Sequence, residues 1–322
     1  MYKKLSQTAD RIEAVLRERR APASVVGGKV LPGFVEMLLR PDPGTKVNQV
    51  KALQADLALA LGNNNVRVAQ SGIHLAVQIP TEQRRQVFLS TLIAGVDHIP
   101  PHTAILGLGE DGSPLMARLS SPDVAHVLIA GTTCSGKTSL AQSMLLSLAR
   151  VNRPHQMGIV VLDPKRREAD VFIRAISRHM MAPVAQSIEE VIQALQRVLQ
   201  LMEQRSIDAD PLPRLVVYAD EMADLCQQGG VQVVEALARI AQRGREAGIH
   251  LIGCTQKPSS QAIGSLLRAN LPLRLVGRVN SASDARVASG MPATGAEKLA
   301  GSGDFLAIHG GKLVRFQAAL PQ

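Results

Sequence analysis

The residues from Gly131 to Thr138 have the types and the spacing of a loop that binds phosphate. They follow the pattern G-x-x-x-x-G-K-[ST], in which backbone N–H groups and the start of a helix face a polyphosphate. We expect Lys137 to reach the β- and γ-phosphate oxygens and Thr138 to ligate Mg²⁺. A chance match is the alternative, but an apolar run precedes the loop and a helical pattern follows at once. The sequence therefore predicts a site for ATP and Mg²⁺ made by Gly131, Thr132, Thr133, Cys134, Ser135, Gly136, Lys137, Thr138 and Ser139.

Two acids follow a second apolar run, residues 215–219. In phosphate-loop enzymes such a strand lies beside the loop, and its first acid helps to hold Mg²⁺, which assigns Asp220 to the metal. The second acid, Glu221, is placed to polarise the attacking water as a general base. The alternative is a polar turn after a buried strand, which the upstream phosphate loop disfavours. Asp224 is expected to be a helix or surface acid.

Polar residues also follow two further strand-like runs. Gln256 comes after residues 251–255 and either hydrogen-bonds the γ-phosphate or its water, or simply caps the strand. Asp163 and Lys165 follow residues 158–162, so they belong at the carboxyl edge of a sheet, where ligands bind. The run Lys165-Arg166-Arg167 is either a solvated charge run or a contact near the nucleotide or a subunit boundary.

The elements that must position these residues alternate along the chain. Strand-like runs are expected at 126–130, 158–162, 214–219, 249–254 and 273–277, with helices at 137–150, 186–205 and 230–247. This alternation predicts an α/β fold with a mostly parallel sheet and helices on both faces. Gly107, Gly109 and Gly112 match G-x-G-x-x-G, but no helix follows, so a β-hairpin turn is expected there rather than a dinucleotide site.

A smaller α/β domain is expected before this sheet. Residues 1–20 form an amphipathic helix pattern, which either packs on the protein or binds a partner, and residues 21–32 interrupt it. A strand at 33–39, a helix at 47–61, strands at 66–69 and 73–79 and a helix from 81 to about 95 follow. We therefore predict a helix at 1–22, a small α/β domain at 23–98 and an ATPase domain at 99–322, with 98–102 as a linker rather than a metal site.

Composition favours a polyanionic partner and an intracellular protein. The 322 residues contain 36 Lys and Arg against 27 Asp and Glu, a net charge of +9. There are no Trp, two Tyr and five Phe residues, too few to supply stacking platforms for single strands, so duplex DNA is the better candidate. The three scattered cysteines predict free thiols in a reducing compartment. No apolar run reaches the roughly 18 residues of a membrane span, and a cytoplasmic location is expected.

Several segments together resemble the motor region of the FtsK/SpoIIIE family of DNA translocases. In family order they are HVLIAGTTCSGKTS, LDPKRRE, VVYADEMADL, ARIAQRGREAGIHLIGCTQKPS, LRANLPLRLVGRV and GAEKLAGSGDFL, and PGFVEMLLRPDPGTKVNQVKALQADLALAL followed by VQIP looks like the family's preceding small domain. The resemblance spans roughly residues 20 to 316. It implies a RecA-like P-loop ATPase domain and a homohexameric ring through which ATP hydrolysis drives double-stranded DNA.

The resemblance also implies residue roles. Lys137 and Thr138 would bind ATP and Mg²⁺, Asp220 and Glu221 would form the second nucleotide motif, and Gln256 would be the sensor. Arg245 matches an arginine finger that reaches a neighbour's γ-phosphate, with Arg243 as the near alternative. Basic residues at three positions would face the DNA channel or else be solvated surface charges, namely Lys257, Arg268 and Arg286.

The chain also departs from the family pattern. Cys134 replaces a usual glycine, which is either harmless or makes the ATPase slow or oxidation-sensitive. Ala282 stands where a lysine is common. A membrane anchor and the winged-helix module that reads DNA are not expected, because no membrane span opens the chain and it ends soon after Phe316.

The sequence thus predicts an ATP-dependent translocase of double-stranded DNA, and its length favours a soluble motor of a phage, plasmid or integrative element. The rivals are a conjugative coupling ATPase that works with a relaxase and a secretion channel, and an ATP-binding ring scaffold that barely hydrolyses.

Overall fold

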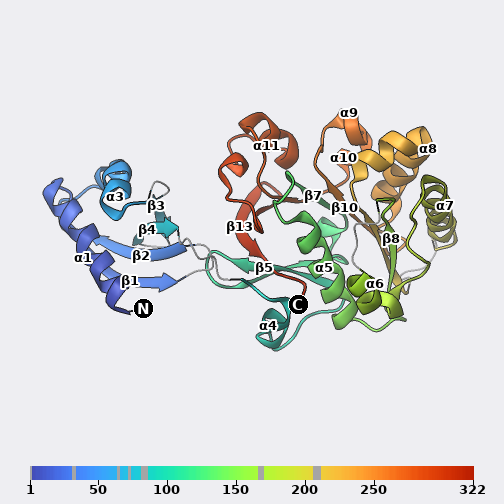
Figure 1. Cartoon of the computed structure of the whole chain (residues 1–322), viewed down its shortest axis with the longest axis horizontal. Helices are drawn as coiled ribbons and strands as arrows, with labels where there is room; N and C mark the ends of the chain where they lie inside the picture. The colour runs from blue at the N-terminus through green and yellow to red at the C-terminus, as the bar shows by residue number, and fades with distance from the viewer. Residues whose placement is uncertain are drawn as a thin grey trace. The chain divides into compact units, whose positions relative to one another are not determined.

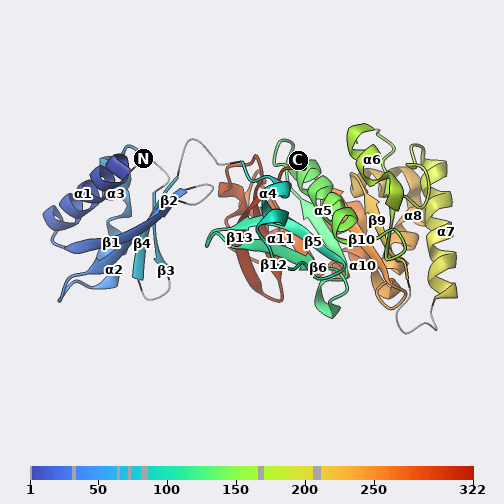
Figure 2. The same cartoon turned by 90° about the horizontal axis from the view of Figure 1, so that it is seen from below.

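The computed structural model describes residues 2–30, 34–63, 66–71, 74–80, 86–165, 170–205 and 212–322. The chain divides into two compact units, Met1–Gln86 and Val87–Gln322 (Figures 1 and 2). The division of the chain at 22/23 and 98/99 stays a prediction. No helix among the described residues is long and apolar enough to cross a membrane.

The first unit is an antiparallel sheet covered by helices. Its strand order is β1-β2-β4-β3, with β1 Ala23–Val30, β2 Phe34–Pro41, β3 Arg67–Ser71 and β4 His74–Pro80. Helices α1 (Tyr2–Glu18), α2 (Val47–Ala52) and α3 (Gln54–Leu61) accompany the sheet. Ile12 and Leu16 of α1 are fully buried in its core. The N-terminal amphipathic helix therefore packs on its own unit.

Residues 21–32 interrupt the N-terminal helix as expected, since α1 ends at Glu18, but two local features of this unit were not predicted. Residues 21–32 contain strand β1, which pairs with β2 although Gly27 and Gly28 interrupt the apolar pattern. A Cβ at Gly28 would lie 3.0 Å from Met37 Sδ, so the close approach of the two strands favours glycine there. The predicted helix at 47–61 is split into α2 and α3 at Leu53. Of the helix expected from residue 81, residues 81–85 lie outside the described residues, residues 86–88 are not helical, and helix α4 covers Leu89–Ala94.

The second unit is built on a nine-stranded sheet with the order β6-β5-β13-β12-β11-β7-β10-β9-β8. Strands β7 (Val127–Ala130), β8 (Met157–Leu162), β9 (Arg214–Ala219), β10 (Ile249–Thr255) and β11 (Leu273–Val276) are parallel, and they are the five predicted strands. Antiparallel strands extend the sheet beyond β11: β12 (Asp304–His309), β13 (Lys312–Ala318), β5 (Thr103–Gly109) and β6 (Pro114–Arg118). The α/β fold is confirmed.

Helices pack on both faces of the parallel strands, as Figure 2 shows. One core joins Leu128, Val217 and Leu251 to α7 (Ile188–Gln204) and α8 (Met222–Arg243). The other joins the alternate residues of the same strands, such as Ile129 and Val216, to α5 (Lys137–Val151). Because both faces are buried, the central strands are continuous apolar runs. The remaining helices of this unit are α4 (Leu89–Ala94), α6 (Asp170–Ile176), α9 (Ser260–Ile263), α10 (Ser265–Ala269) and α11 (Ala282–Ser289), with 3₁₀ turns at Pro122–Val124, Ser177–His179 and Ala296–Lys298.

Of two predictions made at glycine-containing segments, one is confirmed and the other is wrong. Gly112 has φ +83° in the turn between β5 and β6, so the predicted hairpin is confirmed and no dinucleotide loop forms. Helix α8 begins at Met222, not at residue 230, and Gly230 has non-helical angles (φ 57°, ψ −146°) inside it. The Gly229-Gly230 pair hides the first half of this helix in the sequence, because glycine normally weakens a helix.

Two buried histidines lie at the amino ends of the central strands. His250 donates through Nδ1 to the Ala125 carbonyl (3.0 Å), and His126 accepts through Nδ1 from the Leu251 amide (3.0 Å). Burial lowers the pKa of His126 to about 4. Burial, followed by the charge of His126, lowers the pKa of His250 to about 3, although its bond to Ala125 acts in the opposite direction and Arg214 and His102 act in the same one. Both rings are therefore neutral in the folded unit.

This pair makes the second unit acid-sensitive. Below about pH 6.5 the unfolded chain binds protons that the folded rings do not accept, so stability is full above that pH and falls below it. We expect the free energy of unfolding to drop by roughly 2 kcal/mol per histidine between pH 7.5 and 5. Urea unfolding at the two pH values measures this loss.

The matched control is the double variant His126→Asn, His250→Asn, whose amides can make both hydrogen bonds without titrating. It should lose several kcal/mol less than the wild type over the same pH interval. An equal loss in both proteins would assign the acid sensitivity to other groups.

Candidate nucleotide site

The predicted phosphate loop connects the end of β7 to the start of α5. A Cβ at Gly131 would lie 2.8 Å from Ser135 Oγ, and one at Gly136, where φ is +102°, would lie 2.8 Å from the Gly303 amide nitrogen. Both positions therefore require glycine. Lys137 donates through Nζ to the carbonyls of Gly131 (2.8 Å) and Thr132 (2.9 Å). The loop thus surrounds the Lys137 ammonium group at the start of a helix, an arrangement that suits a polyphosphate.

Segments far along the chain hold the loop in this shape. Thr132 donates to the Arg278 carbonyl through its amide (2.8 Å) and its hydroxyl (3.0 Å). The amides of Ser302 and Gly303 donate to the carbonyls of Cys134 (3.1 Å) and Ser135 (2.9 Å). Sequence reasoning missed this support, and its only signal was the glycine-rich segment 301–303.

Cys134 adopts a backbone conformation that favours glycine. Its φ is +62°, in the left-handed region, where a side chain costs roughly 1–2 kcal/mol. Its thiol is exposed, whereas Cys226 and Cys254 are buried. Burial raises the pKa of Cys226 to about 11, which keeps that thiol protonated and unreactive. Cys134 is thus the accessible thiol of the chain.

Alkylation of Cys134 should block ATP binding, because the added group would occupy a loop that closes around the phosphates. We expect N-ethylmaleimide to weaken binding of a fluorescent ATP analogue at least tenfold, as a rough estimate from lost phosphate contacts. ATP present during alkylation should protect the protein. Cys134→Gly, which also relieves the left-handed strain, is the control and should resist the reagent. Equal inhibition of both proteins would locate the effect elsewhere.

The two predicted acids lie at the carboxyl end of β9. Asp220 and Glu221 are 6 % and 7 % exposed. Tyr218 donates its hydroxyl to Asp220 Oδ1 (3.2 Å). Glu221 is in the left-handed region (φ 46°) and precedes α8 as its N-cap residue. Strained backbone of this kind persists where surrounding contacts fix it, often at functional sites.

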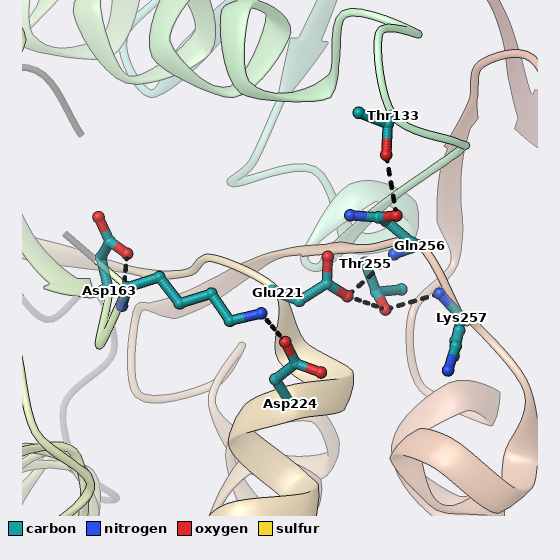
Figure 3. Close-up of polar contacts among 8 residues, drawn as sticks. Thr133, Asp163, Glu221, Asp224, Thr255, Gln256 and Lys257 are labelled. Atoms are coloured by element: carbon teal, nitrogen blue, oxygen red, sulfur yellow. Dashed lines mark hydrogen bonds and ion pairs between the residues drawn. The ribbon is translucent and has the colours of Figure 1, made fainter. Parts of the chain in front are cut away.

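Three strand ends meet at this edge of the sheet, because the parallel strands β7, β10 and β9 follow one another in this order. The strand that carries the two acids was expected directly beside the phosphate loop, but β10 lies between β9 and β7. Glu221 Oε1 accepts from the Thr255 hydroxyl and from the backbone amide of Gln256, each at 3.0 Å (Figure 3). The side chain of Gln256 reaches the phosphate loop, where its Oε1 accepts from Thr133 Oγ1 at 3.2 Å. Gln256 is therefore a link between the loop and the acidic strand end, and not only a strand cap.

A fourth strand end contributes an ion pair. Lys165, which follows β8, donates its amide to Asp163 Oδ1 (3.2 Å) and forms an ion pair with Asp224 in the first turn of α8 (Figure 3). Lys165 is thus not part of a freely solvated charge run, and Asp224 is a helix acid as expected. Arg166 and Arg167 lie outside the described residues.

The candidate arginines and lysine occupy different environments. Lys257 and Arg286 are exposed, so both are open to a polyanion. Arg268 is half-buried, and its Nη2 donates to the Val287 carbonyl (2.6 Å). Arg243 and Arg245 are exposed near the start of β10, and Arg245 lies 3.4 Å from the Pro122 carbonyl. The two therefore lie at the sheet edge opposite the phosphate loop, which stands at the carboxyl ends of the strands.

The site suits ATP and Mg²⁺. A Cβ at Gly131 or at Gly136 would fill space inside the phosphate loop. Thr138 lies in the first turn of α5. Oxygen donors of this kind, one hydroxyl and one or two carboxylates, suit Mg²⁺, which keeps several waters. Among the described residues no group of three or more His, Cys, Asp or Glu could hold a metal ion by itself.

Comparison with known proteins identifies the family. The sequence model of the FtsK/SpoIIIE family matches residues 94–209 and 206–260, and that of the FtsK alpha domain matches residues 1–81. The chain belongs to the FtsK/SpoIIIE family. Its first unit therefore contains the FtsK alpha domain, and the phosphate loop and both acids lie within the family region.

The relatives are longer than this chain. DNA translocase FtsK of Sporosarcina ureae is 34% identical over 324 residues, which cover 89% of the chain and 40% of the relative. DNA translocase SpoIIIE of Bacillus subtilis (strain 168) is 30% identical, with 98% and 44% covered. The chain thus spans less than half the length of these curated relatives.

Solved structures have the same fold. The cytoplasmic domain of the Thermomonospora curvata type VII secretion ATPase EccC superposes with a TM-score of 0.62 at 23% identity, covering 73% of the chain and 32% of EccC. The pCW3 conjugation coupling protein TcpA, in its monomer form with ATPγS, gives 0.61 at 16% identity and covers 98% and 96%. The second unit therefore has the fold of a P-loop ATPase domain.

Proposed function

We propose that this chain is an ATP-dependent translocase of double-stranded DNA that works as a homohexameric ring. The observation that carries the proposal is the hydrogen-bonded connection from Thr133 through Gln256 to Glu221, which joins the phosphate loop to an acid suited to activate water. The two relatives named above carry the description DNA translocase. The net charge of +9 and the scarcity of aromatic residues favour contacts to duplex phosphates.

In the proposed mechanism the chain positions ATP and a water molecule. The loop amides and Lys137 hold the phosphates, and Glu221 takes a proton from the attacking water. Thr138 and Asp220 would hold Mg²⁺, which when bound would neutralise negative charge on the phosphate oxygens. These roles require the anchored carboxylate and the loop to stay at the same edge of the sheet.

The position of Arg245 favours a ring in this proposal. It lies before β10, whereas Gln256 follows that strand, so the length of β10 separates Arg245 from the site of its own subunit. At about 3.3 Å per residue, this strand spans on the order of 20 Å. An arginine finger at this position would act on the neighbouring subunit, and hydrolysis would depend on assembly. Lys257, Arg268 and Arg286 are the proposed DNA contacts, and the bond from Arg268 to the Val287 carbonyl would hold its side chain in place.

The test is steady-state ATP hydrolysis with and without long linear duplex DNA, at low and moderate salt. Strong stimulation by duplex, weaker at higher salt and absent in Lys137→Ala, is the expected result. Displacement of a triplex-forming oligonucleotide from the duplex would then report translocation. Turnover that responds only to single strands or to a relaxase would favour a conjugative coupling ATPase, and absence of turnover would favour a ring scaffold.

A further inference from the structure

One buried hydroxyl connects Glu221 to the segment that leaves β10. Thr255, the last residue of β10, is fully buried. Its Oγ1 donates to Glu221 Oε1 at 3.0 Å and accepts from the Lys257 amide at 3.1 Å (Figure 3). Because the Lys257 amide occupies an acceptor position of the hydroxyl, the hydroxyl proton is directed to the carboxylate.

These contacts orient the carboxylate of Glu221. Its Oε1 takes two donors, the Thr255 hydroxyl and the Gln256 amide. The second oxygen points to the side on which Gln256 and Thr133 lie (Figure 3). One oxygen is thus anchored to β10 and the other faces the phosphate loop, where a water would lose its proton. Since Glu221 also has a left-handed backbone, contacts from β10 help to fix its position.

The same hydroxyl connects this carboxylate to a candidate DNA contact. Lys257 is exposed, and its amide is bonded to Thr255. A force on the Lys257 side chain would move this amide, and the displacement would reach Glu221 through a single hydroxyl group. A buried group with two fixed partners transmits such a shift because neither partner can exchange it for water.

We propose that Thr255 is a positioning residue that orients Glu221 for catalysis and couples it to the segment carrying Lys257. The coupling to DNA rests on the proposed translocase function, whereas the orientation of Glu221 requires only ATP hydrolysis.

Thr255→Val tests the proposal because valine keeps the shape and the β-branch but cannot donate. We expect kcat with duplex DNA to fall by roughly 10- to 100-fold, the effect of a misplaced catalytic group. The KM for ATP should change little, since the Thr255 hydroxyl bonds to Glu221 and to the Lys257 amide, which both lie outside the phosphate loop. Basal turnover without DNA should fall less than the stimulated rate, which lowers the stimulation ratio. Thr255→Ser keeps the hydroxyl and should restore both values.

A double-mutant cycle with Glu221→Gln separates positioning from loss of folding. If Thr255 acts through Glu221, adding Thr255→Val to Glu221→Gln should lower the residual turnover no further. Thermal unfolding and binding of a fluorescent ATP analogue identify a variant that is merely unfolded. Wild-type kcat and stimulation in Thr255→Val, or equal defects in Thr255→Ser and Thr255→Val, would overturn the proposal. Failure of duplex to stimulate the wild type would instead reject the translocase function, and basal kcat would still test the orienting role.

Discussion

Replacing Glu221 with glutamine is expected to reduce ATP turnover by at least about 100-fold while ATP binding is retained. Glutamine keeps a carbonyl oxygen that can accept from Thr255 and from the Gln256 amide, so the local structure should survive. What it loses is the carboxylate that takes a proton from water. Steady-state kcat and the Kd for a fluorescent ATP analogue measure the two effects separately.

Asp224→Asn is the matched control for this variant. Asp224 is an acid three residues further on, and it pairs with Lys165 rather than with Thr255. Turnover of this control should stay close to that of the wild type, because a partly exposed ion pair contributes little. Removal of a general base lowers the rate by more than about tenfold. If Glu221→Gln keeps more than about a tenth of the wild-type rate, another group must therefore activate the water.

The second large effect is expected at Arg245. Arg245→Ala should lower turnover by roughly 1,000-fold, the range associated with loss of an arginine finger. The matched control is Arg243→Ala, since both residues are exposed and they lie two positions apart in the segment before β10. A larger defect in the Arg243 variant would transfer the proposed role to that residue.

Mixing two inactive variants distinguishes action across an interface from action within a subunit. Subunits with Glu221→Gln keep Arg245, and subunits with Arg245→Ala keep Glu221. In a mixed ring, some sites receive both groups from adjacent subunits, so part of the activity should return. Activity that stays at the sum of the two separate preparations would contradict an arginine finger supplied in trans.

The sequence predicted the parts of the fold in which local pattern and burial agree. The five parallel strands and α5 lie where apolar runs and the phosphate-loop pattern placed them. Parallel strands buried on both faces are continuously apolar, and this signal does not depend on tertiary contacts. The sequence also predicted that the phosphate loop, Asp220, Glu221 and Gln256 lie close together, since the carboxyl ends of parallel strands share one edge of the sheet.

Features fixed by contacts between distant segments could not be predicted. Strand β1 contains Gly27 and Gly28, which suggest a loop until the proximity of Met37 is known. The first half of α8 is concealed by Gly229-Gly230. The sequence around a threonine at a strand end does not indicate its hydrogen-bond partner. The contact of Thr255 with Glu221, which is 34 residues away, therefore could not be predicted.

The supports of the phosphate loop define how much of the chain a nucleotide site needs. Every residue of the motif lies between 131 and 139, yet Thr132, Cys134 and Ser135 are bonded to Arg278, Ser302 and Gly303. A fragment that ends before Arg278 would carry all the motif residues and still lack the backbone groups that shape them. Such a truncated protein should match every sequence signature of an ATPase and yet bind nucleotide poorly. The segment that follows β11 and the glycine-rich turn that precedes β12 are thus structural components of the ATP site, and the motif residues alone do not form it.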